Sequence, residues 1–417
     1  WYKLDRVNGT SLSSIMFNDD PLYPVLTGSA AGELKVKANN RDYYSAGLQS
    51  NLARRFSSGS WNHKLTAGFR YHTDRIRRYQ FADLYQQNAD GSVQNNPGFS
   101  GPGNEGDRRQ AVDALAFYIQ DEISQGYWTF IPGIRFESVD WDYFRADSRD
   151  PDIQDDGDFT MTAPGLSVRY QPSDAWVYFG GAYRGISPPS PGGARSGLEE
   201  ERRNSFELGV RHRTPQGFYL EGLAFYSDFE NLITAESIAN GGSDENIGEV
   251  DVRGFEAQMG VDLADYSNTK LSLPLYLSVT WTDATFVDPT DGQSDPESIF
   301  FGAVDGNELP YIPEWQFFAR MGIESERWSV TASLGYTDDR FGTGDNALGD
   351  PNDVRVGKLD AHWIVDLAGD YQITDQWEIF GSATNVLDET YIASRLPHGL
   401  RPGAPALWRV GARYFWD

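Results

Sequence analysis

Apolar and polar residues alternate along the last segment of the chain. In WRVGARYFW (408–416), every second position is Trp, Val, Ala, Tyr or Trp, and the positions between them are mostly arginine and glycine. A period of two is that of an extended strand, whose side chains point to opposite faces in turn. The pattern predicts a strand with its apolar face toward lipid and its polar face toward a wet lumen.

The same two-faced pattern recurs upstream. In WSVTASLGY (328–336), tryptophan, valine, alanine, leucine and tyrosine share one face, and serine, threonine and glycine share the other. Segments 34–56 and 61–79 are also predicted strands. About fifteen to sixteen strands are expected in all, because turn residues interrupt the alternation at regular intervals.

Short turns and long polar connections alternate between these predicted strands. Short turns are expected at 57–60, 125–126, 172–174, 214–217, 265–268, 326–327 and 374–376, and long connections at 81–107, 146–157, 187–202, 237–247, 287–307, 341–353 and 396–402. Aromatic residues gather beside the short turns, as in interfacial girdles. The fold class predicted is therefore all-β, a transmembrane antiparallel up-and-down β-barrel with its short turns on the periplasmic side.

Composition agrees with strands as the membrane-crossing elements. The 417 residues carry a formal charge of −26 and 14% aromatic residues, and contain no run near the length of a transmembrane helix, which takes about 20 apolar residues. A closed barrel is the other way to satisfy backbone hydrogen bonds in lipid. The acidity argues against nucleic acid as a partner. The absence of cysteine removes disulfides and thiolate chemistry.

The strand count predicts that part of the barrel precedes Trp1. An odd number of strands that starts from the long-loop side does not fit a bacterial barrel with an even strand number. A plugged barrel of about 22 strands fits the size class. Residues 1–417 are thus expected to be the barrel portion, with about seven strands and an N-terminal plug outside the chain.

Nine segments spread over the chain resemble one family. They are ANNRDYYSAGLQS (38–50), RGISPPSPGG (184–193), SFELGVRHR (205–213), FYSDFENLI (225–233), NIGEVDVRGFEAQ (246–258), ELPYIPEWQ (308–316), GYTDDRF (335–341), NVLDETYIASR (385–395) and GLRPGAPALWRVGARYFW (399–416). Together they resemble the barrel of a TonB-dependent outer-membrane transporter of the ferric citrate and siderophore receptor branch. Asp417 departs from the family pattern, which ends on an aromatic residue.

The resemblance implies active uptake of a ferric chelate, a siderophore or ferric citrate, into the periplasm of a Gram-negative bacterium. It also implies several partners: the TonB energy-transducing complex acting through a plug outside this chain, outer-membrane lipid and lipopolysaccharide, and the barrel assembly machinery. A passive porin-like channel stays an alternative, as does TonB-dependent uptake of cobalamin, haem or a sugar. An outer-membrane enzyme or adhesin would need a catalytic constellation or binding repeats.

Arginines near the outer rim are the candidate ligand contacts. Ferric chelates present oxygen atoms and negative charge, and the guanidinium fork donates paired hydrogen bonds while staying charged. By strand direction the candidates are Arg184, Arg195, Arg340, Arg395 and Arg401, together with His398 in the loop LPHGLRPG. For any one arginine, pairing with a neighbouring acid is the more common role.

Two acidic loops suggest calcium, and no motif suggests an enzyme. Segments 149–158 and 287–298 gather carboxylates, which fits a structural calcium ion, although the EF-hand spacing is absent and a solvated or lipopolysaccharide-bridging loop explains them as well. The five histidines lack metal-ligand spacing, and no G-x-S-x-G elbow occurs. No catalytic residue, cofactor or resident metal site is predicted.

Overall fold

One long antiparallel sheet makes up most of the molecule. The structure is a computed structural model that describes residues 2–4, 7–8, 23–26, 28–96, 106–146, 152–234, 245–267, 269–289, 298–351, 353–396 and 399–416. Eighteen strands form the main sheet, and small hairpin sheets flank it. Among the described residues, no helix has the length and apolar character needed to cross a membrane.

Fifteen of these strands, the eighteen less the short β1, β2 and β5, each pair with the next in chain order. They are β3 (Gly32–Ser58), β4 (Trp61–Gln87), β6 (Asp107–Gln125), β7 (Trp128–Ala146), β8 (Ile153–Tyr170), β9 (Trp176–Ser187), β10 (Glu201–Arg213), β11 (Tyr219–Glu230), β14 (Glu249–Asp262), β15 (Pro274–Asp288), β16 (Trp315–Glu324), β17 (Trp328–Thr337), β21 (His362–Gln372), β22 (Trp377–Thr384) and β25 (Leu407–Tyr414). The predicted all-β, up-and-down architecture and the strand number are confirmed.

The remaining elements are short. β1 (Tyr2–Leu4) and β2 (Val7–Asn8) pair with β3, and β5 (Val93–Asn96) pairs with β4. The small sheets and helices are β12 (Ile233–Thr234), β13 (Glu245–Asn246), β18 (Arg340–Phe341), β19 (Gly349–Asp350), β20 (Asp353–Leu359), β23 (Ile392–Ser394), β24 (Arg401–Pro402), α2 (Tyr23–Leu26), α3 (Pro191–Arg195) and the 3-10 helix η1 (Leu263–Tyr266).

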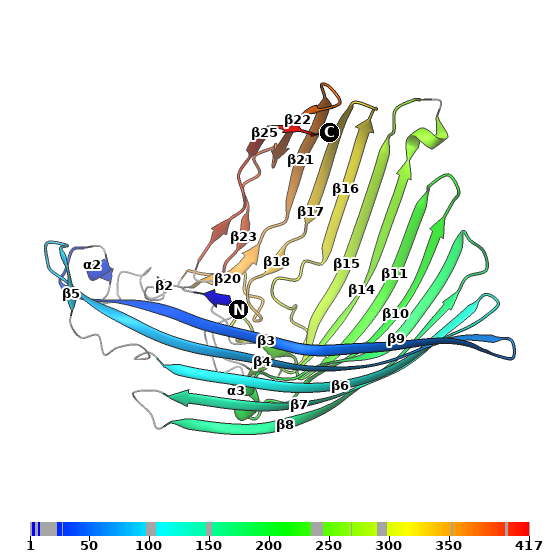
Figure 1. Cartoon of the computed structure of the whole chain (residues 1–417). Coiled ribbons are helices and arrows are strands. Elements are labelled where there is room, and N and C mark those ends of the chain that lie inside the picture. The colour runs from blue at the N-terminus through cyan, green and yellow to red at the C-terminus, as the bar shows by residue number, and fades with distance from the viewer. Residues whose placement is uncertain are drawn as a thin grey trace.

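The sheet curls into a single curved wall. In Figure 1, β3 to β8 cross the front, β9 to β11 turn at the right, and β16 to β22 stand behind them. In the described part of the chain, β25 pairs with β22 and no pairing joins β25 to β3. A total of 22 strands and a plug therefore stay predictions.

Two predicted strand ends were wrong. β4 continues past Tyr79 to Gln87, because β3 pairs with it as far as Gly32 opposite Gln87. β8 begins at Ile153, so residues 153–157, which include Asp155 and Asp156, belong to a strand and not to a loop. In both places backbone hydrogen bonds to the neighbouring strand outweigh the low strand preference of polar side chains. The predicted order of short turns and long connections is otherwise confirmed by the strand bounds.

The two faces of the sheet differ in chemistry. On the outer face, Leu52, Ala67, Ile119 and Ile134 follow one another across β3, β4, β6 and β7. Leu52 is 75% exposed and Val410, on β25, is 91% exposed. Such a continuous exposed apolar surface is far larger than a soluble protein normally presents. It suits contact with lipid.

A mainly apolar band on this outer face has the height of a bilayer core, and its polar members Arg54, His63 and Asp121 lie toward the tight turns. Trp61, Trp128 and Tyr170 lie near the tight turns, and Trp128 and Tyr170 are in ring contact at 4.5 Å. Tyr71 lies further along β4 and marks the other edge of the band. Ten residues separate Trp61 from Tyr71, which at about 3.3 Å per residue and a tilt of about 40° corresponds to roughly 25 Å.

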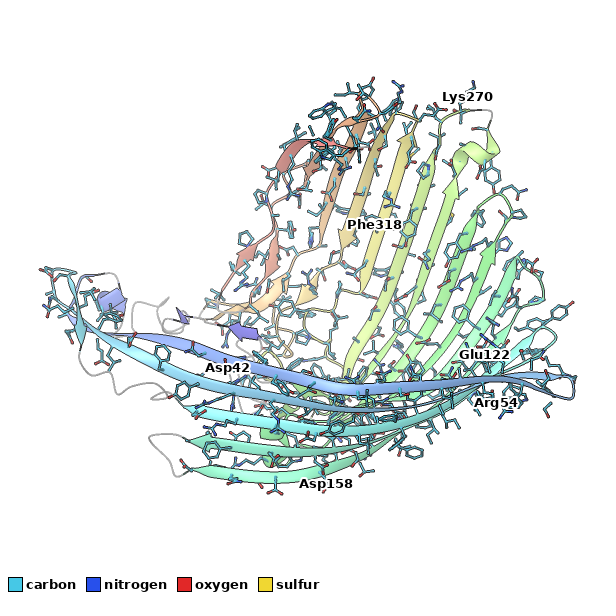
Figure 2. The ribbon with its side chains drawn as sticks, in the orientation of Figure 1. Asp42, Arg54, Glu122, Asp158, Lys270 and Phe318 are labelled. Carbon is cyan, nitrogen blue, oxygen red and sulfur yellow. The ribbon has the colours of Figure 1, made fainter. Side chains whose placement is uncertain are left out.

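The inner face carries polar side chains and the packed connections. Ala114, Val139 and Met161 form a buried cluster on this face near α3. Ile247, Val250 and Phe286 form a second one beneath the connections of β11, β14 and β15. Figure 2 shows side chains on both faces along the wall: Glu122 is on the inner face near the tight turns, whereas Arg54 and Asp42 are on the outer face of β3, toward its two ends.

Adjacent positions on β17 test this assignment of faces. Ala332 lies on the outer face within the apolar band, and Thr331 lies on the inner face. We expect Ala332→Arg to lower the free energy of unfolding by about 2–4 kcal/mol, because the guanidinium would face the lipid midplane. Thr331→Arg should cost less than about 1 kcal/mol. Denaturant titration of the receptor folded into phosphatidylcholine vesicles measures both, and equal costs would contradict the assignment.

Candidate arginine site at the wide end of the inner face

Four arginines occupy one cross-strand row, here called the arginine row. Arg41 of β3 lies opposite Arg78 of β4, Arg78 lies opposite Arg108 of β6, and Arg108 lies opposite Arg145 of β7. Directly opposed side chains in an antiparallel sheet have Cβ atoms about 4.5–5.5 Å apart. Four positive charges therefore lie side by side across the sheet, at the end of the wall opposite the tight turns.

The row lies on the inner face. Arg77 and Arg109, one position away, share the outer face with Tyr71 and Phe117 because side chains alternate along each strand. All four members of the row are half-buried. The row thus faces the concave side of the sheet.

Helix α3 adds a fifth arginine next to this row. Ser190 caps the helix by accepting a hydrogen bond from the Gly193 backbone N–H at 3.1 Å, and Pro191 supplies the fixed backbone angle of the first turn. The guanidinium of Arg195 lies 5.7 Å from the Tyr143 ring, and its Nε is 3.8 Å from an Asp155 carboxylate oxygen. Tyr143 and Asp155 belong to the inner-face row adjacent to Arg145.

Arg395 has a structural role among the connections. Its guanidinium donates hydrogen bonds to the carbonyl oxygens of Val354, Val356 and Lys358, at 3.0, 3.3 and 3.0 Å. Its backbone N–H donates to the Tyr311 hydroxyl at 3.1 Å. Arg395 therefore fastens β20 to the β22–β25 connection.

Arg340 lies in the same group of connections. It is 8% exposed, and it donates hydrogen bonds to the carbonyl oxygens of Asp338 and Ala393, each at 3.4 Å. Burial lowers the pKa of Arg340 from its ordinary value, and the group nevertheless stays charged near neutral pH. The structure thus brings the predicted Arg340 and Arg395 together, apart from Arg195.

The other predicted residues are separate. Arg184 lies on the outer face of β9, where its Nε donates to the Asn204 side chain at 3.0 Å. Arg401 is exposed in β24. His398 lies outside the described residues, as do four of the nine acidic residues in the segments 149–158 and 287–298 that were predicted to bind calcium. Ligand contact at all six predicted positions, and calcium binding, stay predictions.

Sequence reasoning missed the arginine row. Two doublets, Arg77-Arg78 and Arg108-Arg109, are the signal that was available. In a strand a doublet places one side chain on each face, so each strand contributes one arginine to the inner face. Only the pairing register shows that the inner members lie opposite one another, because a shift of one residue would exchange the faces.

The arrangement suits an anion with several oxygen atoms. Each guanidinium offers five N–H donors in a planar fork, which matches carboxylate or phosphate oxygens. Among the described residues, no group of three or more His, Asp or Glu side chains is arranged to hold a metal ion.

Comparisons with known proteins identify relatives. A family model described as "TonB dependent receptor-like, beta-barrel" matches residues 3–386. The solved structure of the ferric citrate transporter FecA in the unliganded form is similar at 20% identity and a TM-score of 0.75, over 92% of this chain and 57% of that one. The open form of the ferric-catecholate import receptor Fiu from E. coli K12 is similar at 16% identity and a TM-score of 0.69, over 99% and 58%.

A third similar structure is the siderophore receptor PiuA from Acinetobacter baumannii, at 15% identity and a TM-score of 0.68, over 99% of this chain and 60% of that one. Identities this low show a shared fold. The chain spans less than two thirds of the length of each of these three structures.

Substitution of Arg395 tests whether its hydrogen bonds stabilise the connections. Arg395→Ala removes three hydrogen bonds from a charged donor, so we expect the local stability of β18 and β20 to fall by about 3 kcal/mol. Faster amide hydrogen exchange in 340–359 would report this change. Arg401→Ala is the control, since Arg401 is exposed and should leave exchange there unchanged. Equal exchange in both variants would show that Arg395 does not hold β20.

Proposed function

The chain belongs to the TonB-dependent receptor family, matching its β-barrel domain, and from this premise we propose that it forms the barrel wall of a receptor that imports an anionic ferric chelate. The family consists of transport receptors in the outer membrane of Gram-negative bacteria, which also gives the proposed location. The cargo is a ferric siderophore or ferric citrate, carried from the cell surface into the periplasm.

The arginine row is the observation that supports this cargo most directly. Carboxylate and catecholate oxygens carry the negative charge of anionic ferric chelates, and charge-assisted hydrogen bonds from arginine are about twice as strong as neutral ones. Arg195 extends the row along α3. A chelate resting there would contact β4, β6 and the helix at once.

The inner face of β3 to β10 is basic as a whole, although the chain is strongly acidic. Arginines outnumber carboxylates on it, and they are Arg41, Arg55, Arg70, Arg78, Arg108, Arg135, Arg145, Arg169, Arg203, Arg211 and Arg213. An excess of one charge sign on a wall raises the local concentration of an oppositely charged solute. The inner face therefore attracts an anion along its whole length as well as at the arginine row.

Energy for the import would come from TonB, acting on a plug domain contributed by sequence outside these residues. The basic inner wall is the surface that such a plug would face. Barrel assembly machinery would insert the strands, and outer-membrane lipid would surround the apolar band. A passive channel is the weaker candidate, because the family consists of energised receptors.

The other nutrients that members of the family import differ from anionic ferric chelates in their charge. Cobalamin and sugars present little negative charge, so a row of four arginines offers them no particular advantage. Haem carries two carboxylates and is the nearest competitor. Competition between haem, ferric citrate and a ferric siderophore in a single binding assay would rank the affinities of the receptor for the three.

Paired substitutions test the proposed site. Arg78→Gln with Arg108→Gln removes the two central charges of the row, and we expect affinity for an anionic ferric chelate to fall about 10- to 100-fold, since hydrogen bonds to charged groups contribute about 1.5–3 kcal/mol each. The salt dependence of binding should also decrease. The measurement is equilibrium binding of the radio-iron chelate to outer-membrane vesicles at several ionic strengths.

The matched control changes the neighbouring positions. Arg77→Gln with Arg109→Gln removes the same charge from the outer face of the same two strands. Its affinity for the chelate should stay within about twofold of the unmodified receptor. Equal losses in the two variants, or none in either, would remove the arginine row from the binding site.

A further inference from the structure

A recess lies on the inner face of the wall, at mid-height of the apolar band. Its volume is about 500 Å³, which is in the range of about 300–1,000 Å³ that is typical of small-molecule sites. Two of its lining residues, Gln120 and Gly133, lie in register with Thr66 of β4. Thr66 is halfway between Trp61 and Tyr71, which mark the two edges of the band. We call this site the inner recess.

The pairing register places the recess on the inner face. Gly133 of β7 pairs with Gly165 of β8, and Arg135 pairs with Ala163. These positions alternate with Ile134, which is on the outer face. Because glycine and alanine have little or no side chain, the backbone of β7 and β8 forms the floor of the recess.

Two tyrosines, each fixed by a hydrogen bond, form the walls of the recess. The Tyr118 hydroxyl donates to the Asn51 side chain across β4. Only glycine fits beneath it, because a Cβ atom at Gly68 would lie 2.6 Å from the Tyr118 ring. The Tyr183 hydroxyl donates to Glu207 at 2.7 Å. Rings held in this way lose little conformational freedom when a ligand binds.

Polar donors surround the floor. Arg135 donates from Nε to Glu137 at 2.9 Å, and its side chain is 32% exposed, so its terminal N–H groups can reach a ligand in the recess. Gln49, Gln120 and Ser167 also line the recess and add amide and hydroxyl donors. An anion with several oxygen atoms would therefore find donors on more than one side.

The recess carries less positive charge than the arginine row. Three arginines and two glutamates line it or lie next to its lining, and they are Arg70, Arg135, Arg203, Glu137 and Glu207. The excess is one positive charge. A site on a path has to bind its ligand firmly enough for entry and weakly enough for release. The recess fits that requirement better than a row of four arginines, which suits capture from dilute solution.

The inner recess and the arginine row are separate sites on the same sector of the wall. Arg145 and Arg135 are ten residues apart on β7, which at about 3.3 Å per residue and a tilt of about 40° corresponds to roughly 25 Å. A small ferric chelate does not span this distance. It would have to leave the row before it contacts the recess.

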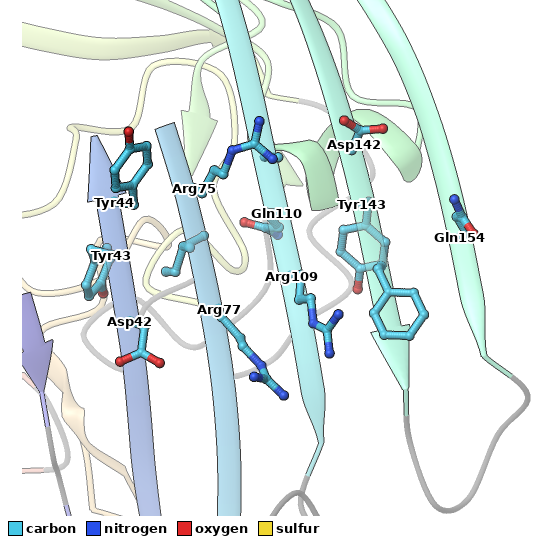
Figure 3. Close-up of a pocket in the computed structure, with 13 residues that line it drawn as sticks. Asp42, Tyr43, Tyr44, Arg75, Arg77, Arg109, Gln110, Asp142, Tyr143 and Gln154 are labelled. Atoms are coloured by element: carbon cyan, nitrogen blue, oxygen red, sulfur yellow. The ribbon is translucent and has the colours of Figure 1, made fainter. Parts of the chain in front are cut away.

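Helix α3 and a buried apolar cluster lie between the two sites. A Cβ atom added at Gly192 of α3 would lie 3.0 Å from the Gln110 side chain and 3.4 Å from the Tyr143 ring. The helix thus rests on β6 and β7 next to the arginine row, where Figure 3 shows it beside these two residues. The cluster around Val139 follows along β7. The inner recess supplies polar contacts again beyond this apolar stretch.

We propose that the inner recess is a second, weaker binding site, which an anionic ferric chelate occupies after it leaves the arginine row. Arg135, Gln120 and Ser167 donate hydrogen bonds to the chelate oxygens, and Tyr118 and Tyr183 pack on either side. The cargo then passes along β6 to β9. This inference rests on the proposed function, because it requires an anionic chelate as cargo.

The inner face of β17 provides a control at the same level of the membrane. Thr331 and Ser333 lie there on either side of Ala332, which is at the lipid midplane of the outer face. β17 contains no arginine. Thr66 and Thr331 are therefore matched positions, one beside the recess and one away from it.

A fluorescent label at each of these positions tests the inference in the full-length receptor. The chain contains no cysteine, so Thr66→Cys and Thr331→Cys each allow one label on the inner face. In cells with an energised inner membrane, the ferric chelate should quench the label at position 66 at least three times as strongly as the label at position 331. An uncoupler should abolish this difference. Equal quenching at both positions, or none at position 66 during radio-iron uptake, would overturn the proposal.

Filling the recess is an independent measurement. A Cβ atom at Gly133 would have its nearest contacts at 3.5 Å, so Gly133→Leu with Ala163→Leu should fold and occupy the floor. We expect radio-iron uptake to fall at least tenfold, while equilibrium binding at the arginine row stays within twofold. Thr331→Leu with Ser333→Leu should keep both. Equal loss of uptake in the two variants would show that any narrowing of the lumen blocks import, and would refute the recess.

One further readout separates the recess from a seat for the plug. If the recess only held a side chain of the plug, the filled variant would admit large hydrophilic antibiotics and would still show quenching at position 66, which would contradict the proposal. Should the leucines prevent folding, Arg135→Gln with Glu137→Gln removes the ion pair without adding volume. Quenching at position 66 should then fall at least threefold, and unchanged quenching would also refute the recess.

Chelate binding to the unmodified receptor separates this inference from the proposed function. Absence of binding would refute both the arginine row and the inner recess. Binding and uptake without quenching at position 66 would refute the inner recess alone.

Discussion

Backbone hydrogen bonding is the constraint on which this architecture depends. In lipid an unpaired N–H or C=O group costs several kcal/mol, so each strand that crosses the bilayer must be paired along its length. Each of the fifteen long strands pairs with the next in the chain. Pairing fixes the pleat, and the pleat sends successive side chains to opposite faces. The wall thus has a lipid side and a water side that differ by one residue in sequence.

That single-residue difference explains how the arginine doublets serve two surfaces. Arg78 and Arg108 face the concave wall, where we propose that a ferric chelate binds. Arg77 and Arg109 face outward, where Asp107 holds them beside aromatic rings. The connections at this end add to the inner surface, because α3 positions Arg195 and the hairpin at β18–β20 is fastened by Arg395. The outer-face and inner-face arginines are therefore neighbours in sequence, but the backbone of the sheet lies between their side chains.

Much of the fold could be predicted from local pattern. The alternation in 328–336 and 408–416 identified the faces of β17 and β25, because lipid leaves no freedom to mix the two environments. The ends of β4 and β8 could not be found this way, since polar residues such as Asp155 are extended only through pairing with β7. The arginine row depends on register across four strands. Arg395 was predicted to contact a ligand, and its hydrogen bonds to the carbonyls of β20 could not be predicted because they arise from a contact distant in sequence.

The central claim is that adjacent residues of β4 face opposite sides of a membrane wall. The chain contains no cysteine, so single-cysteine variants at Thr66, Ala67, Phe69 and Arg70 can be labelled without background. A lipid-soluble maleimide should react at 67 and 69, and a charged, water-soluble maleimide should react at 66 and 70. Labelling without alternation, or alternation with the opposite phase, would contradict the assignment of both faces and of the sites built on them.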